Sequence, residues 1–410
     1  MLFFILAGIY ALHNGASLYK RQTSEINKIN EKVSTEIQEN VAFFDSGQLG
    51  PAARPWVNLS DPFWAVWYSP RYHFKGPSPA IVYSIGQAEQ YGFYKRVSFM
   101  SSPYDADMAE EIANPERLQA GTMDFSFVAL FLLPLLLLVC LYNVKGAEAD
   151  SGILSLIYAQ TRSQKSWLLS RVAFYFSLLS LSVLGLMVYG AMLTDVFGSA
   201  IAAFGSIYLL LFFYLVFWSA AFFLIIYKGH SSIGNTFAMV GVWLLFTFFI
   251  PAAVHQWVST KYPANLMTDF IDAQRDDREE IYDLSESDFQ TRLIELFPEI
   301  SQSIAARDSN LRSAAISDSY SALTNALMKA SIKEIEKSNE AKNKLIHASY
   351  WLNPLTLMQH QLNQFTETDY YDYQDYRNEL QVRIDQRIRD LVLDTWNGVV
   401  VDKERYLEYQ

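Results

Sequence analysis

Residues 172–227 have the sequence VAFYFSLLSLSVLGLMVYGAMLTDVFGSAIAAFGSIYLLLFFYLVFWSAAFFLIIY, in which Asp195 is the only charged residue. The next stretch, residues 229–260, contains no Asp, Glu, Lys or Arg. A helix that crosses about 30 Å of hydrocarbon needs about 20 consecutive apolar residues. These two stretches can therefore hold three membrane-spanning helices, and the chain is predicted to be an integral membrane protein.

Two further apolar runs, one at the start of the chain and one after residue 124, complete the predicted membrane region. The first run lacks a basic segment and a small-residue cleavage site, so we interpret it as a retained span and not as a signal peptide. The fold class is predicted to be an all-α polytopic membrane protein with about five visible transmembrane helices. We predict these spans at about Met1–Ser17, Phe125–Val144, Val172–Leu193, Phe197–Tyr227 and Thr236–Trp257.

Charge in the short connections predicts the orientation, because basic residues favour the cytosolic side. The linker 145–171 carries four basic residues, the turn at Asp195 carries none, and the turn after the fourth span begins with Lys228. The linker is therefore predicted to be cytosolic. The two large polar blocks, 18–123 and 258–410, are then both predicted to lie on the far side of the membrane.

The predicted domain organisation follows from this arrangement. The first block is expected to begin as a helix and then to become irregular, because six prolines follow between residues 51 and 79. The second block has no glycine before residue 398, which favours long helices. We divide the chain into the first span (1–17), a mostly helical extracytoplasmic domain (18–123), a transmembrane bundle (124–257) and a second, helical extracytoplasmic domain (258–410).

Composition limits the kinds of partner and cofactor. The net charge of −11 argues against nucleic acid as a partner. Cys140 is the only cysteine, so no disulfide framework and no cysteine-based metal site can form within the chain. The six histidines are scattered singly along the sequence, and no metal site is predicted.

Several motifs resemble those of a known family. Within the linker, the resemblance to type-2 ABC exporter permeases rests on Glu148, Gly152, Leu154, Gln160, Arg162, Ser163, Trp167 and Arg171. Four other segments resemble the subgroup of permeases named for multi-copper enzyme maturation: YALHNG at 10–15, NPERLQAGTMDF at 114–125, LPLL at 133–136 and NPL at 353–355. Members of this family normally have six spans and a cytosolic segment before the first. We expect the sixth span and that segment to be absent here or supplied by another chain.

The resemblance implies a permease subunit of an ABC transporter in the bacterial cytoplasmic (inner) membrane. Its implied partners are a cytosolic ATP-binding subunit, a second permease copy or sister permease, membrane lipids and an extracytoplasmic protein. ATP and Mg would be bound by the partner subunit, because this chain has no G-x-x-x-x-G-K-[S/T] loop. We therefore expect no cofactor and no enzymatic activity in the chain itself. The sequence does not identify the substrate.

The linker is predicted to couple this chain to the ATPase. An apolar face would dock in a groove of the partner, and charged residues would form ion pairs around it. The alternative is an ordinary connector that lies on the membrane surface. The predicted coupling residues are Glu148, Asp150, Gly152, Ile153, Leu154, Leu156, Ile157, Gln160 and Arg162.

An aromatic cluster in the first polar block is a candidate for substrate contact. Aromatic residues favour the membrane–water interface and also form adaptable apolar surfaces, so packing within a small domain is the alternative interpretation. The candidate residues are Trp56, Phe63, Trp64, Trp67 and Tyr68. For the whole chain, a non-transporting scaffold or sensor, whose helical outer domain binds a partner, remains the alternative function.

Overall fold

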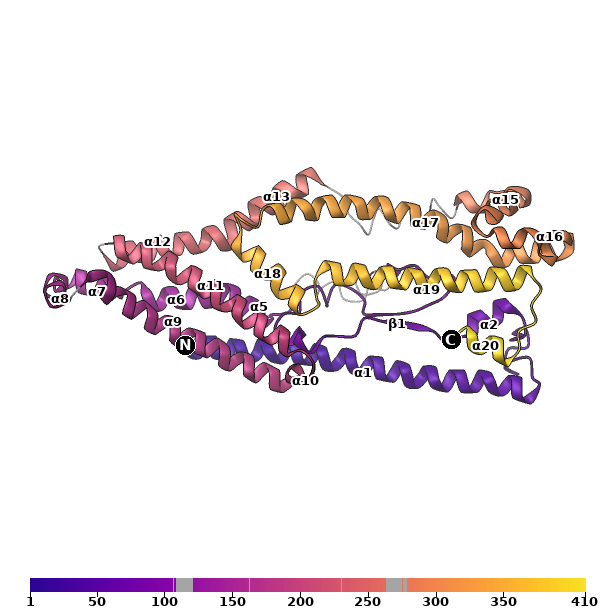
Figure 1. The fold of residues 1–410 in the computed structure, drawn as a ribbon, viewed down its shortest axis with the longest axis horizontal. Helices are drawn as coiled ribbons and strands as arrows, with labels where there is room; N and C mark the ends of the chain where they lie inside the picture. The colour runs from indigo at the N-terminus through magenta and orange to yellow at the C-terminus, as the bar shows by residue number, and fades with distance from the viewer. Residues whose placement is uncertain (106, 108–120, 162, 230, 263–274, 276–278) are drawn as a thin grey trace.

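The structure is a computed structural model that describes residues 1–105, 107, 121–161, 163–229, 231–262, 275 and 279–410. The molecule is long and mostly helical, with a bundle of apolar helices at one end and a group of more polar helices at the other (Figure 1). The predicted multi-pass, all-α membrane protein is confirmed. Five helices are long and apolar enough to cross a membrane, namely Leu2–Ser46, Phe125–Asp150, Gln164–Leu193, Ile201–Lys228 and Ser232–Lys261.

The first helix, α1 (Leu2–Ser46), extends through both halves of the molecule (Figure 1). It combines the predicted span 1–17 with the helix that follows it, because no proline interrupts the 45 residues. α1 ends at Gly47, whose φ of 69° is the left-handed conformation common after helices. The Sδ atom of Met1 lies 3.8 Å from the Oγ atom of Ser182, well inside the third span.

The second and fifth spans each contain a π-helical turn just before a proline. The second span consists of α5 (Phe125–Phe127), η2 (Val128–Leu132) and α6 (Leu133–Leu141), and Pro134 follows η2. The fifth consists of α12 (Ser232–Leu244), η3 (Leu245–Phe249) and α13 (Ile250–Lys261), and Pro251 follows η3. Proline lacks an amide hydrogen, and a local π-helical adjustment is one way in which a membrane helix accommodates it.

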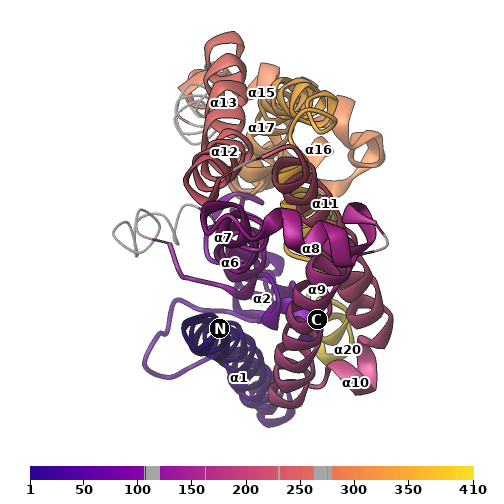
Figure 2. The same cartoon turned by 90° about the vertical axis from the view of Figure 1, so that its left-hand side faces the viewer.

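The third and fourth spans are α9 (Gln164–Leu193) and α11 (Ile201–Lys228), joined by the short helix α10 (Val196–Ser199). α9 begins well before the predicted Val172, so its first turns belong to the predicted linker. Asp195 is exposed at the turn before α10, as expected for a solvated turn residue. This turn and the polar helices lie at one end of the bundle, whereas α7 (Gly146–Asp150) and α8 (Leu154–Gln160) form the opposite end, here called the linker end (Figures 1 and 2).

The polar end, here called the polar unit, is built from both polar blocks and the second half of α1. The first block contributes α2 (Pro62–Tyr68) and the antiparallel pair β1 (Tyr72–Phe74) and β2 (Tyr94–Arg96). Its short helix η1 (Pro79–Val82) packs instead into the core of the bundle through Ala80 and Val82. The second block contributes α15 (Glu286–Leu296), η4 (Pro298–Gln302), α16 (Ile304–Arg307), α17 (Ser309–Ala348), α18 (Pro354–Phe365), α19 (Tyr370–Trp396) and α20 (Lys403–Glu408).

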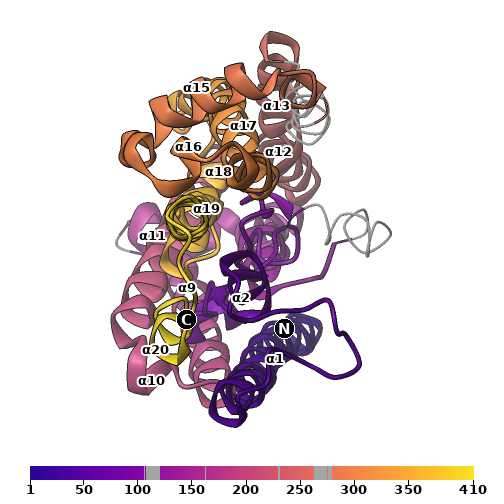
Figure 3. The same cartoon turned by 90° about the vertical axis from the view of Figure 1, so that its right-hand side faces the viewer.

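The two blocks form one packed body, which differs from the predicted division into domains 18–123 and 258–410. Val66 and Phe99 of the first block belong to the same buried core as Leu380, Ile388 and Trp396 of α19. Figure 3 views the polar unit from its far end and shows α2 and α20 between α1 and α19. Most of the buried core residues come from the second block, and the first block adds Ala65, Val66, Val97 and Phe99.

Helix α18 connects the polar unit to the bundle. Its Leu355 and Leu362 side chains are buried in the core of the bundle, together with residues of the membrane-spanning helices. Asn353 caps the helix, because its side-chain oxygen accepts a hydrogen bond from the amide of Thr356 at 3.3 Å. The motif at 353–355 therefore marks the start of the helix that joins the two halves of the molecule.

Candidate functional site at the two ends of the bundle

The linker end consists of two short helices, α7 and α8, that meet at Gly152. Gly152 has a φ of 76°, a conformation that glycine adopts at little cost. α7 ends in a Schellman motif, in which the amide of Ile153 donates to the carbonyl of Glu148 and the amide of Gly152 donates to that of Ala149, both at 3.1 Å. No heavy atom lies within 4 Å of a Cβ atom built on Gly152. The glycine is therefore needed for its backbone conformation and not for close packing.

Glu148 is held by the same chain. The Nη1 atom of Arg171, on α9, donates to Oε1 of Glu148 at 2.5 Å and to the carbonyl of Val144 at 3.0 Å. The guanidinium of Arg171 also lies 4.5 Å from the centre of the Trp167 ring. The Glu148 side chain is 13% exposed, so solvent only partly screens the ion pair. This pair fixes α7 to α9, and the ion pair of Glu148 with a partner subunit stays a prediction.

Helix α7 also packs tightly against the start of α12. A Cβ atom on the buried Gly146 would lie 2.6 Å from Cα of Ser232, so only glycine allows this approach. The amide of Ser232 donates to Oδ2 of Asp150 at 3.2 Å, and Lys145 Nζ donates to the carbonyl of Tyr227 at 2.8 Å. Asp150 stays exposed, but it too contacts its own chain. α7 is thus attached to three membrane-spanning helices.

Helix α8 presents the exposed apolar side chains of the linker end. Ile153 is 48% exposed and Leu156 is 58% exposed, and we call these two residues the α8 patch. Leu154 and Ile157 are half-buried, and α8 contains no fully buried residue. The structure therefore brings the predicted apolar docking residues together on a protruding helix.

The end of the linker is anchored to α9 by aromatic contacts. Gln164 Nε2 donates to the hydroxyl of Tyr158 at 2.6 Å, and the ring of Tyr158 meets that of Trp167 edge-on with centres 6.2 Å apart. Gln160, predicted to contribute to coupling, is exposed at the end of α8. Arg162, also predicted to do so, lies outside the described residues.

The five predicted substrate-contact residues lie on α2 and on the loop before it: Trp56, Phe63, Trp64, Trp67 and Tyr68. Phe63 packs against Phe99 of the polar-unit core, with ring centres 5.4 Å apart. The hydroxyl of Tyr68 accepts a hydrogen bond from Arg54 at 2.7 Å. Trp56 is 64% exposed and Trp67 is 40% exposed. Most of the cluster therefore serves the packing of the polar unit, and Trp56 and Trp67 retain free surface.

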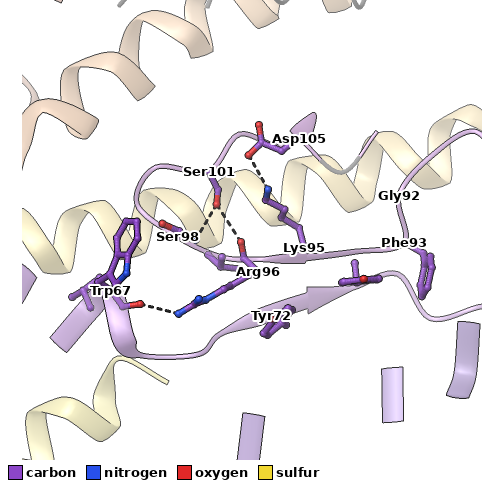
Figure 4. Close-up of a pocket in the computed structure, with 12 residues that line it drawn as sticks. Trp67, Tyr72, Gly92, Phe93, Lys95, Arg96, Ser98, Ser101 and Asp105 are labelled. Atoms are coloured by element: carbon purple, nitrogen blue, oxygen red, sulfur yellow. Dashed lines mark hydrogen bonds and ion pairs between the residues drawn. The ribbon is translucent and has the colours of Figure 1, made fainter. Parts of the chain in front are cut away.

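Trp67 also lines a cavity of about 430 Å³ beside β2, which none of the other four candidates lines (Figure 4). Lys95 pairs with Asp105 at 3.0 Å, and Arg96 Nη2 donates to the carbonyl of Trp67 at 2.8 Å. Ser101 Oγ donates to the carbonyl of Arg96 at 3.1 Å. The charged groups of this cavity thus all have partners within the chain, and the arrangement does not indicate a particular ligand.

A polar network joins the bundle to the polar unit at the end opposite the linker. Asp124 Oδ2 accepts from the amide of Ile85 at 3.0 Å, and Ser126 Oγ donates to Asp124 at 2.8 Å. Gln359, on α18, donates to Ser126 at 3.1 Å and to Asn363 at 3.0 Å. The network connects the first block, the start of the second span and α18. It was not predicted, because its members come from three distant segments that share no motif.

A cavity of about 330 Å³ lies beside this network and is rich in carboxamide side chains. Gln87, Gln90, Gln359 and Asn363 line it, together with Asp124. The Oε1 atom of Gln87 is buried and has no hydrogen-bond partner among the described residues. Glu89 also lines it, and because carboxamides both donate and accept hydrogen bonds, the cavity offers hydrogen-bonding groups of both kinds.

Two histidines that are distant in sequence meet at the junction of α17 and α18. The ring centres of His347 and His360 are 4.9 Å apart, and Tyr350 and Tyr371 pack around them. Burial, and then the neighbouring His360, lower the pKa of His347. Within the described part of the chain, no three His, Cys, Asp or Glu residues form a group that could hold a metal ion.

The two ends of the bundle differ in what they can do. The linker end offers an exposed apolar patch beside a firmly attached helix. The opposite end, where the bundle meets the polar unit, offers hydrogen-bonding groups around a cavity. Neither brings together a nucleophile, a base and an orienting group among the described residues. No family model, no curated protein and no solved structure matches this chain.

Proposed function

We propose that this chain is the membrane-spanning permease subunit of an ABC transporter, specifically an exporter, and that ATP is hydrolysed by a separate cytosolic subunit. The observation that carries the proposal is the construction of the linker end. A patch of apolar side chains, Ile153 and Leu156, stands exposed on α8, and the adjacent helix α7 is fixed to the bundle by the Glu148–Arg171 pair. An exposed apolar patch next to a helix that is firmly attached to the bundle suits a docking element that transmits force.

The attachment of α7 supports a mechanical role. α7 contacts α9 through Arg171 and α12 through Ser232, and Lys145, the residue that precedes α7, donates to the carbonyl of Tyr227 on α11. A partner that pulls on α8 would therefore displace the ends of three spans together. α18 packs into the end of the bundle that lies opposite the linker. This motion would therefore reach the cavity lined by Gln359 and Asn363. A nucleotide-dependent change in docking is required, since a partner shifts an equilibrium only through differential affinity.

We place the linker end in the cytosol and the polar unit outside the cytoplasmic (inner) membrane of a bacterium. The basic residues at the linker end support this orientation. Single cysteines at Ser34 and Ser163, in a Cys140→Ser background, test it in intact cells. An impermeant thiol reagent should label the cysteine at position 34 and not the one at 163. The reverse pattern would contradict the orientation.

Recruitment of an ATPase tests the function itself. The full chain, purified from native membranes in mild detergent, should retain an ATP-binding subunit detectable by mass spectrometry. Leu156→Glu should release that subunit, because a carboxylate at the centre of an apolar contact would have to be desolvated. Val400→Glu is the matched control, since Val400 is a 77% exposed residue of the polar unit. Failure to recover an ATP-binding subunit, or equal retention by both variants, would contradict the proposal.

One observation favours a second candidate, a non-transporting scaffold or sensor. The two polar blocks share one core and form a single body, which could bind an extracytoplasmic partner while the spans only anchor it. This candidate predicts that Glu148→Lys has no effect on function. The permease proposal predicts that Glu148→Lys inserts normally into the membrane and uncouples ATP hydrolysis from transport.

A further inference from the structure

The lipid-facing surface between α9 and α11 carries a groove in its linker-end half. The groove has a volume of about 340 Å³. Its lining residues come from the first turns of α9 and the last turns of α11, and all are apolar except Ser219. They are Leu169, Val172, Ala173, Phe176, Val216, Ser219, Ala220 and Phe223.

Small side chains create the groove. Ala173, Ser219 and Ala220 leave a depression where the larger residues on either side project. On α9 the lining runs from Leu169 to Phe176, a rise of about 10 Å at 1.5 Å per residue. This is the shape of a slot parallel to the membrane normal. A slot that is apolar along its length and open to lipid suits a hydrocarbon chain.

Aromatic residues close both ends of the slot. Towards the middle of the membrane, Phe176 meets Phe212 edge-on with ring centres 5.2 Å apart. Towards the linker end, Phe223 stacks on Tyr227 at 6.1 Å. The slot therefore has a defined length and begins one helical turn below the end of the bundle.

Positive charge lies directly beyond the linker end of the slot. Lys165 is exposed, and its Nζ atom lies 5.6 Å from the centre of the Tyr227 ring. Lys228 follows at the last position of α11 and is also exposed. Neither lysine forms an ion pair with any residue that the structure describes. The carboxylate of Glu148, at the same end, is already paired with Arg171.

We propose that this groove binds one anionic phospholipid, with an acyl chain in the slot and the phosphate headgroup at Lys165 and Lys228. The assignment rests on the order of groups along the helices: an apolar slot, then an aromatic ring, then two ammonium groups that form no ion pair with a described residue. This is the order of acyl chain, glycerol region and phosphate in a lipid leaflet. Basic pockets between membrane helices are known to recognise such headgroups. The inference does not depend on the proposed transport function.

Native mass spectrometry of the full chain in detergent tests the site, with dioleoyl-phosphatidylglycerol as the anionic lipid and dioleoyl-phosphatidylcholine as the neutral one. The wild-type chain should retain one phosphatidylglycerol in preference to phosphatidylcholine. Lys165→Gln and Lys228→Gln should each weaken retention roughly five-fold, the effect of about one basic residue near an anionic lipid. Lys261→Gln is the matched control, because Lys261 also lies over a tyrosine ring, that of Tyr262, at the opposite end of the bundle.

Filling the slot gives a second, independent measurement. Ala220→Trp should abolish the preferential binding, whereas Leu209→Trp, at a 55% exposed position on the same helix outside the groove, should leave it unchanged. The lysine variants lie beyond the apolar slot and keep the test valid if Ala220→Trp fails to fold. Equal binding of the two lipids, or lysine variants that bind like the wild type, would overturn the proposal. So would a disulfide-linked dimer of Ala173→Cys in a Cys140→Ser background, which would place a second copy of the chain in the groove.

Discussion

The hydroxyl of Tyr214 on α11 donates a hydrogen bond of 2.8 Å to the carbonyl of Leu130 in the second span. Leu130 lies four residues before Pro134, so in a regular helix its carbonyl would receive the amide hydrogen that proline lacks. Tyr214 is fully buried in the bundle core and supplies the missing donor from a neighbouring helix. The π-helical turn η2 is thus held in place by a side chain from another span.

Removal of this hydroxyl should destabilise the bundle. We expect Tyr214→Phe to lower the free energy of unfolding by about 1 kcal/mol, because a buried carbonyl loses its donor. Pro134→Ala should reduce the cost of Tyr214→Phe, because residue 134 regains an amide hydrogen. Unfolding of the four proteins in mixed detergent micelles measures the coupling. Strictly additive effects would show that Tyr214 does not compensate for Pro134.

The turn between α7 and α8 should respond to backbone geometry alone. Gly152→Ala and Gly152→Val should each cost about 1–2 kcal/mol locally, because side chains disfavour the left-handed conformation, and Gly152→Asn should cost less. The loss should appear as faster proteolysis and amide exchange within residues 146–160. Gly205→Ala is the control, because an added Cβ there also meets open space and the backbone is not left-handed. Equal effects at Gly152 and Gly205 would contradict the interpretation.

Among the residues of α19, Arg387 should be the one whose replacement most weakens the packing of the two polar blocks against each other. It is 1% exposed and donates to the carbonyls of Tyr409, Val66 and Ser69. Arg387→Met leaves these carbonyls without that donor, at about 1–3 kcal/mol for each buried group.

We therefore expect a lower unfolding temperature for Arg387→Met and earlier proteolytic release of α20. Arg389→Met, which removes only an exposed pair with Glu299, should behave like the wild type. The same unfolding temperature for both variants would show that Arg387 does not hold the two blocks together.

The contribution of protonated Asp372 to the free energy of unfolding of the polar unit should fall as the pH rises. Burial, then the hydrogen bond and charge of Asp369, raise the pKa of Asp372 to about 7, against about 3.9 in an unfolded chain. The folded protein therefore binds this proton more tightly. The stabilisation is complete below about pH 4 and is lost as the pH rises through about 7.

Asp372→Asn isolates this contribution, because the amide oxygen can still accept the hydrogen bond from the Asp369 amide, 3.1 Å in the wild type. The difference in unfolding temperature, wild type minus Asp372→Asn, should fall between about pH 4 and about pH 7. A difference that stays constant or rises over this interval would contradict the raised pKa.

The membrane-spanning helices were predictable because their signal is local. A run as long as residues 172–227 with a single charged residue has few stable arrangements outside a bilayer, and that residue, Asp195, marks its turn. Gly152 was also predictable as a turn, since a lone glycine between two short helical segments commonly ends the first one. These features depend on neighbours in sequence, and the structure places them as expected.

Contacts between distant segments were not predictable in the same way. Nothing in the sequence pairs Glu148 with Arg171, His347 with His360, or Gln359 with Ser126. The division into two polar domains was reasonable from the chain order, yet Val66 and Trp396 share one core.

Hydropathy and local backbone preference determine the number of spans, the alternation of spans with polar segments and the helical character of the polar blocks. The sequence of residues therefore already contains these features. The single polar unit, the insertion of α18 into the bundle and the internal pairing of Glu148 depend on which surfaces meet when the helices pack. Burial of a shared apolar core favours one such arrangement over many. That free energy is a sum over contacts between residues hundreds of positions apart, so no local pattern carries it.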